Sequence, residues 1–143
     1  MKILLVEDER LVAMTVLDAL EAEGHSAAHA LGTDEALALA AASPAATPFD
    51  LALVDARLAY GDSGIAACQI LLDRHSIPAL LTTGWGEIPG HVGSFALGVL
   101  YKPFTRTELG ASIRAIGDMF AGEDPGLLPE RLELFSERLR RAG

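Results

Sequence analysis

Short apolar runs bounded by turn residues alternate along this chain with stretches in which hydrophobic residues recur at helical spacing. The apolar runs predict five strands, over residues 2–6, 26–31, 49–55, 77–83 and 98–101. The periodic stretches predict helices over residues 10–23, 36–42 and 65–74, with a further helix after residue 105. Strands that alternate with helices in this way are typical of an α/β protein with a parallel sheet covered on both faces.

The first predicted helix has a distinct apolar pattern. Leu11, Met14, Leu17 and Leu20 follow one another in steps of three, and we expect them to share the face that packs on the sheet. Gly24 is the expected stop of this helix, because glycine readily adopts the left-handed conformation that follows a helix end.

Capping signals define the start of two other helices. Thr33 is expected to cap the helix over residues 36–42. Thr105 and Glu108 have the spacing of a capping box, in which each side chain bonds the other residue's backbone N–H. The last helix should therefore begin directly after Thr105.

Polar residues follow four of the predicted strands. Glu7 and Asp8 come after the first strand, Asp55 and Thr83 end the third and fourth, and Lys102 follows the fifth. A flavodoxin-like, doubly wound sheet has the strand order 2-1-3-4-5, and ligands bind outside the carboxyl ends of its strands at the switch in strand order. The sequence therefore predicts that these five side chains converge on one site.

Composition and charge limit the function classes. The 143 residues are 50% hydrophobic, which suits one globular domain, and the net charge of -9 disfavours nucleic acid or an anionic membrane as partner. Since no apolar stretch approaches the roughly 20 residues of a membrane span, we expect a cytoplasmic protein with protein partners. Cys68 is expected to be a small core residue, and the four histidines, which lack ligand spacing, to lie on the surface or in loops.

The residue types at the predicted site indicate phosphoryl chemistry. Glu7, Asp8 and Asp55 form an all-oxygen set without histidine or cysteine, which suits Mg²⁺. Lys102 can neutralise a phosphoryl group, Thr83 can donate to one of its oxygens, and Asp55 is the candidate nucleophile. Taken singly, each residue has a plainer interpretation as a helix-start acid, a turn, a strand end or a surface lysine. Their joint occurrence at four strand ends favours the site.

Four motifs, "VEDE", "LALVDARL", "LLTTG" and "YKPF", occur in an order and spacing that resemble the receiver domain of two-component response regulators. The resemblance covers residues 1–121. It implies that Asp55 accepts a phosphoryl group from a histidine kinase or a phosphotransfer protein, with Thr83 and Lys102 contacting the phosphoryl oxygens. The same resemblance implies a cis peptide bond before Pro103.

The resemblance also implies a ligand set for Mg²⁺. Glu7, Asp8 and Asp55 would supply carboxylates, and Arg57 would supply its backbone carbonyl. On this interpretation the protein is a phosphoacceptor in signalling rather than an enzyme. Its main alternatives are a pseudo-receiver that binds a partner without phosphorylation and a phosphate sink that drains a kinase. An aspartyl phosphatase is disfavoured because Arg57 stands where such enzymes need a second acid.

Two departures concern the switch residues of the family. Val99 occupies the position at which most receivers carry an aromatic residue, and Tyr101, on the same strand face, is the candidate substitute or a plain packing residue. Residues 84–98 contain five glycines and Pro89 where a receiver has its fourth helix, so we expect an irregular segment with at most one turn over residues 91–96.

The stretch "PALLTTGWG" is similar to the signature of the so-called FAT GUY receivers, although Leu81 and Thr82 stand where that signature has Phe and Ala. This similarity implies kinases of the HWE or HisKA-2 type as partners. Trp85 is then a candidate partner contact, or else a ring folded over apolar surface.

The end of the chain, residues 122–143, is expected to be a linker and a helical extension. Leu128, Leu132, Phe135 and Leu139 are spaced like the apolar stripe of an amphipathic helix. That stripe would pack on its own domain, on a second copy to form a homodimer, or on a downstream protein target. No output domain is recognisable, so we interpret the chain as a stand-alone receiver.

Overall fold

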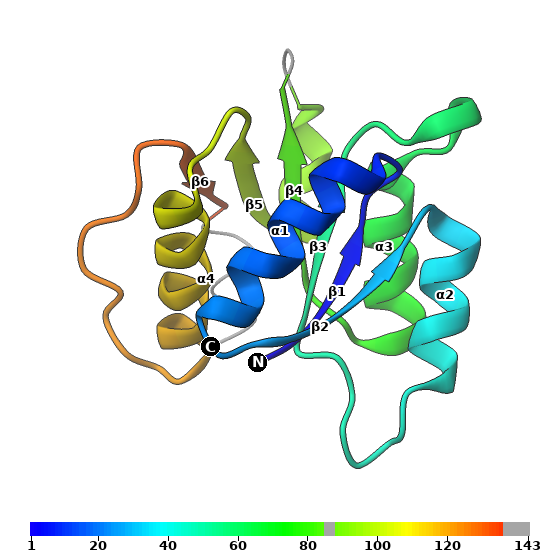
Figure 1. Ribbon diagram of the computed structural model, residues 1–143, viewed down its shortest axis with the longest axis horizontal. Coiled ribbons are helices and arrows are strands. Elements are labelled where there is room, and N and C mark those ends of the chain that lie inside the picture. The colour runs from blue at the N-terminus through cyan, green and yellow to red at the C-terminus, as the bar shows by residue number, and fades with distance from the viewer. Residues whose placement is uncertain (85–87, 136–143) are drawn as a thin grey trace.

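The computed structural model describes residues 1–84 and 88–135 and shows a sheet of order β2-β1-β3-β4-β5-β6 with helices on both faces (Figure 1). The predicted flavodoxin-like order 2-1-3-4-5 is confirmed, and a sixth strand extends it. The strands are β1 (Lys2–Val6), β2 (Ser26–Ala30), β3 (Leu51–Asp55), β4 (Ala79–Thr83), β5 (Ala96–Tyr101) and β6 (Leu132–Leu134). The α-helices are α1 (Arg10–Ala22), α2 (Thr33–Ala42), α3 (Gly64–His75) and α4 (Arg106–Phe120), and the short 3-10 helices are η1 (Ala59–Gly61) and η2 (Gly90–Ser94).

The sheet separates two hydrophobic clusters, because successive strand residues face opposite sides. In β1, Leu4 and Val6 pack with α2 and α3, whereas Ile3 and Leu5 pack with α1 and α4. Cys68 of α3 is fully buried in the first cluster, as expected of a core residue. Burial on both faces explains why the central strands are continuous apolar runs.

The predicted packing face of α1 is wrong for its first two residues and correct for its last two, since Leu17 packs against the core and Leu20 is 1% exposed. Leu11 and Met14 are 81% and 60% exposed, and the buried residues of this helix are Ala13, Val16, Ala19 and Leu20. A helix turns by about 100° per residue, so steps of three drift by about 60° each and place Leu11 opposite Leu20. The prediction followed the large apolar residues, whereas the face that the helix buries is formed mainly by smaller ones such as Ala13 and Ala19.

The two predicted caps have different outcomes. Thr105 and Glu108 form the expected capping box, with both hydrogen bonds 3.0 Å long. Thr33 is instead the first residue of α2, after Gly32, and its hydroxyl donates to Asp62 Oδ1 at 2.7 Å. The threonine therefore joins α2 to the segment that follows β3.

The segment between β4 and β5 contains no α-helix among residues 84 and 88–95. Its one regular turn is η2, and Val92 and Phe95 at and after this turn are buried against the sheet. The predicted irregular segment is therefore confirmed in its described part. Trp85 lies outside the described residues.

The predicted C-terminal helix is wrong where the structure describes it. After α4 the chain loops outward and returns to the edge of β5, where Leu132–Leu134 forms the antiparallel strand β6 (Figure 1). The open edge of β5 offers unpaired backbone groups that an extended segment can satisfy, and this outweighs the helical spacing of the leucines. Leu139 and the other residues after Phe135 lie outside the described part of the chain.

Candidate functional site

The predicted convergence of polar side chains is present in the structure. Asp8, Asp55, Thr83 and Lys102 line one cavity of about 270 Å³ at the carboxyl ends of β1, β3, β4 and β5. Register explains this placement, since Val6 pairs with Val54, Asp55 with Thr82 and Thr83 with Tyr101. Parallel strands in register end at the same edge, so residues far apart in sequence become neighbours.

Three carboxylates of this site lie close enough to share a cation. Glu7, Asp8 and Asp55 each offer an oxygen, and these atoms all lie within 4.8 Å of one another. Glu7 is only 3% exposed, and its Oε2 is buried without a hydrogen-bond partner among the described residues. An all-oxygen set with an unsatisfied buried carboxylate oxygen fits Mg²⁺, because the cation supplies the missing interaction.

The pKa of Glu7 reflects this crowding. Burial, and then the adjacent Asp55 carboxyl, raises the pKa of Glu7 to about 7, although the positive charge of Lys102 acts in the opposite direction. Without a cation, Glu7 therefore holds a proton at neutral pH for part of the time.

Lys102 connects the two acids. Its Nζ lies 3.1 Å from Glu7 Oε1 and 3.0 Å from Asp55 Oδ2. Burial lowers the pKa of Lys102, but its hydrogen bonds and ion pairs with Asp55 and Glu7 outweigh burial and raise it above the ordinary value. The lysine is therefore positively charged at the site. The expected cis peptide bond to Pro103 is present.

Backbone contacts fix the orientation of Asp55. Its Oδ1 accepts a hydrogen bond from the Arg57 N–H at 3.0 Å, while its side chain remains 14% exposed. Gly64 begins α3 directly against this residue, and a Cβ on Gly64 would overlap the Asp55 carbonyl oxygen. Sequence reasoning missed Gly64, which is required by close backbone approach rather than by its own conformation. The metal-binding role of the Arg57 carbonyl stays a prediction.

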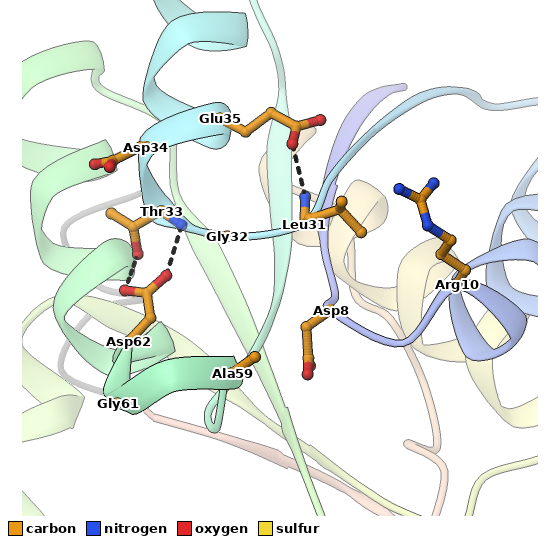
Figure 2. A pocket seen from close by; sticks show the side chains of 10 residues that line it. All are labelled: Asp8, Arg10, Leu31, Gly32, Thr33, Asp34, Glu35, Ala59, Gly61 and Asp62. Carbon is orange, nitrogen blue, oxygen red and sulfur yellow. Dashed lines mark hydrogen bonds between the residues drawn. The ribbon is translucent and has the colours of Figure 1, made fainter.

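Asp62 is a second residue that the sequence analysis missed. Its carboxylate accepts from the Thr33 N–H at 2.8 Å and from the Thr33 hydroxyl at 2.7 Å, as Figure 2 shows. A backbone bridge between Arg57 and Ser63 closes the loop that carries Asp62. The loop after Asp55 is thus closed by this bridge and held to α2 through Asp62.

This clamp borders a larger cavity of about 610 Å³, lined by Asp8, Arg10, residues 31–35, Ala59, Gly61 and Asp62 (Figure 2). Asp8 lines both cavities. Burial alone would raise the pKa of Asp62, but the hydrogen bonds from Thr33 and the Ser63 backbone outweigh it and lower that pKa. Asp62 is therefore ionised at neutral pH and holds α2 as a carboxylate.

One histidine differs from its expected place. His29 lies within β2, half-buried, and its Nε2 donates to the backbone carbonyl of Glu7 at 2.7 Å. This contact helps to hold the chain where β1 ends and the acids begin. The signal was available in the sequence, because His29 lies inside the strand predicted over residues 26–31.

The two switch candidates on β5 share a face, as predicted. Val99 is fully buried, and Tyr101 packs on the same cluster. The Tyr101 hydroxyl donates to Glu133 Oε2 at 2.9 Å, which connects the end of β5 to β6. Whether either residue acts as a switch stays a prediction.

Comparison with known proteins agrees with this fold. The doubly wound sheet has three acids, a threonine and a lysine near its carboxyl edge, as the resemblance to receiver domains implies. The family model described as "Response regulator receiver domain" matches residues 3–114, and the chain belongs to this family. No helix in the described ranges 1–84 and 88–135 is long and apolar enough to cross a membrane.

Among curated relatives, the transcriptional regulatory protein CpxR of Escherichia coli (strain K12) is 35% identical over 118 residues, which cover 80% of this chain and 48% of CpxR. The regulatory protein VanR of Enterococcus faecium is 32% identical over 117 residues, which cover 80% of this chain and 48% of VanR. The chain thus spans about half the length of the curated relatives it matches.

Among solved structures, a CheY-like receiver domain protein from Methanospirillum hungatei JF-1 aligns with a TM-score of 0.71 and 23% identity. The alignment covers 82% of this chain and 93% of that protein. It supports the fold.

Proposed function

We propose that this receiver accepts a phosphoryl group on Asp55 in a Mg²⁺-dependent reaction and thereby switches a protein partner. The observation that carries the proposal is the placement of Asp55. Its carboxylate opens on a cavity, lies 3.0 Å from Lys102 Nζ and shares the three-acid cluster with Glu7 and Asp8.

The reaction is an in-line displacement at phosphorus. An Asp55 carboxylate oxygen forms a P–O bond while the P–N bond of a phosphohistidine breaks, and the imidazole keeps the electron pair and takes up a proton. Mg²⁺ held by Glu7, Asp8 and Asp55 would offset negative charge on the transferred group. Lys102 remains beside the new phosphoryl oxygens as a fixed positive charge, and Thr83 lines the same cavity as a hydroxyl donor.

The donor that fits this chemistry is a histidine kinase or a phosphotransfer protein, and the output is contact with a downstream protein. The net charge of -9 argues against direct contact with nucleic acid. The relatives whose names describe transcriptional regulation are about twice as long as the matched region. On this proposal the matched region acts as a phosphoacceptor that signals by contact with a protein partner.

Intact-mass measurement tests the proposal directly. The protein is incubated with Mg²⁺ and either acetyl phosphate or a purified histidine kinase, and Asp55→Asn serves as the acceptor variant. Asp73→Asn, an exposed carboxylate on α3, is the matched control. We expect one added phosphoryl group in the wild type and in Asp73→Asn, and none in Asp55→Asn. No mass gain with any competent donor would overturn the proposal and leave a phosphorylation-independent pseudo-receiver.

A further inference from the structure

The edge of β5 carries a short segment that lies beyond the family match at residue 114. This segment, residues 131–135, is called the strap below. Its central strand β6 pairs antiparallel with β5, with Leu134 opposite Gly98 and Leu132 opposite Leu100. The Tyr101 N–H donates to the Arg131 carbonyl at 2.9 Å, and the Phe135 N–H donates to the Leu97 carbonyl at 2.8 Å. Backbone hydrogen bonds thus hold the strap at both ends.

Side chains of the strap reach both hydrophobic clusters. Leu132 is 7% exposed and packs with Leu134 on the α1 and α4 side, whereas Phe135 packs on the opposite side. A Cβ on Gly93 of η2 would lie 3.7 Å from Phe135 Cβ, so the phenylalanine contacts the segment that replaces the fourth helix. Three paired residues with few buried side chains make a weak element, which can open without unfolding the sheet.

Gly98 makes close docking of the strap feasible. A Cβ at this position would overlap the carbonyl oxygen of Glu133 and lie 3.0 Å from the Leu134 Cα. All three of the nearest atoms to such a Cβ belong to the strap. The edge of β5 is therefore shaped to accept an extended backbone, and the fit depends on one absent methyl group.

A continuous set of contacts joins the strap to the phosphoacceptor. Lys102 Nζ is bound to Asp55, and the neighbouring Tyr101 pairs with Thr83 across β4 and β5. Burial, and then the Glu133 carboxylate, raises the pKa of Tyr101, so its hydroxyl keeps its proton and donates to Glu133 at 2.9 Å. Tyr101 thus lies between the two site residues and the strap.

We infer that the edge of β5 is a strand-binding surface whose occupant is the strap, and that phosphorylation of Asp55 releases it. This inference rests on the proposed function. The phosphoryl group brings nearly two negative charges and three acceptor oxygens, which draw in Thr83 and Lys102. Tyr101 precedes Lys102 in the chain and pairs with Thr83 across β4 and β5, so it moves with both residues. Its hydrogen bond to Glu133 is then lost. The released edge is then open to a strand of the partner.

Amide hydrogen exchange on the full chain tests the release. The amides of Tyr101 and Phe135 report the two terminal bonds of the strap. In protein shown by intact mass to be phosphorylated, we expect both amides to exchange about fivefold or more faster than in the unmodified protein. Unchanged exchange in phosphorylated protein overturns the strap inference and leaves phosphoryl acceptance standing. If no phosphorylated mass forms, both proposals fail.

Two variants displace the strap without touching the acceptor. Gly98→Ala places a methyl group against the Glu133 carbonyl, and its control is Gly117→Ala, whose Cβ would meet Met1 Cε at an ordinary 3.6 Å. Glu133→Ala removes the acceptor of the Tyr101 hydroxyl, and its control is Glu130→Ala, an exposed carboxylate three residues earlier. In the unmodified protein, Gly98→Ala should already show the fast exchange at Phe135.

Binding of beryllofluoride, an analogue of the phosphoryl group, gives a reciprocal readout. Since coupling between two sites is mutual, a chain whose strap is weakened should bind this analogue with Mg²⁺ about fivefold or more tightly than its control. Glu133→Ala serves here if Gly98→Ala fails to fold. Equal affinities in Glu133→Ala and Glu130→Ala would overturn the inference.

Discussion

Lys102 and Asp55 form the shortest charged contact of the site, with 3.0 Å between Nζ and Oδ2, and the same Nζ lies 3.1 Å from Glu7 Oε1. One lysine therefore neutralises two acids that would otherwise repel each other. The arrangement holds the acceptor carboxylate in a fixed orientation before any donor arrives.

Removing this lysine should affect phosphoryl transfer and metal binding in opposite directions. In Lys102→Ala the rate of phosphorylation should fall by about 10²-fold, because a fixed positive charge is lost from the transition state. Mg²⁺ should bind more tightly, because the three acids lose their internal counter-ion. Both are measured on the same variant, by intact-mass time courses and by calorimetric titration.

Lys102→Arg is the matched variant for this experiment, since it keeps the charge and changes its geometry. It should retain wild-type Mg²⁺ affinity more closely than Lys102→Ala does. Weaker Mg²⁺ binding in Lys102→Ala would show that the lysine supports the metal site rather than competing with it.

The raised pKa of Glu7 gives the metal-free protein a definite pH dependence. The pKa is about 7 in the folded chain against 4.5 for an unperturbed glutamate, so the folded state binds more protons between these values. The Glu7 contribution to the free energy of unfolding is fully present below pH 4.5 and is lost as pH rises through about 7. Added Mg²⁺ should therefore raise the melting temperature more at about pH 8 than at about pH 6.

Glu7→Gln tests that assignment, and Glu9→Gln, which changes an exposed acid lining the cavity beside Asp55, is its control. The pH dependence of the Mg²⁺ effect should largely disappear in Glu7→Gln and persist in Glu9→Gln. Persistence in both variants would assign the titration to another group.

The Asp62–Thr33 clamp should stabilise the loop after Asp55. Asp62→Ala is expected to lower the free energy of unfolding by about 1 kcal/mol, since two hydrogen bonds to a partly exposed carboxylate are lost. Because the pKa of Asp62 is lowered in the folded chain, this stability is present above 3.8, the ordinary pKa of an aspartate, and is lost as pH falls through the folded pKa. Urea denaturation at several pH values measures both.

Thr33→Ser keeps the hydroxyl and should behave like the wild type in the same experiment, whereas Thr33→Val should lose part of the clamp. Equal stability of the serine and valine variants would mean that only the backbone N–H matters.

The corrected face of α1 predicts unequal costs for two leucines of the same helix. Leu20→Ala should lower the free energy of unfolding by about 2–5 kcal/mol, because its side chain is 1% exposed in the core. Leu11→Ala, at 81% exposure, should change it by less than about 0.5 kcal/mol. Chemical denaturation of both variants checks the assignment, and a large cost at Leu11 would contradict it.

The site was predictable because it depends on strand topology. Once alternating strands and helices indicate a doubly wound sheet, residues that follow β1, β3, β4 and β5 must meet at one edge, as Asp8, Asp55, Thr83 and Lys102 do. Gly64 and Asp62 could not be found in this way. Their roles depend on the path of the loop after β3, which residue types alone do not specify.

The errors in the fold have a common origin in tertiary context. Leucine spacing at residues 128–139 fits a helix, but the open edge of β5 and Gly98 favour an extended backbone at Leu132–Leu134. Thr33 has a side chain suited to capping a helix, but its hydroxyl donates instead to the Asp62 carboxylate of a distant loop. In both cases a partner far away in sequence decides the local structure.

The pleat of β1 has a consequence for how mutations act on this protein. Ile3 and Leu5 face one hydrophobic layer and Leu4 and Val6 the other, and the next two residues are the buried Glu7 and the half-exposed Asp8. Deleting one residue of β1 would turn the later side chains of this strand to the opposite layer and exchange the surroundings of the two acids that follow it. Such a chain would be only one residue shorter, with almost the same charge and hydrophobicity. It would nevertheless lose both the packing of its core and its cation-binding geometry.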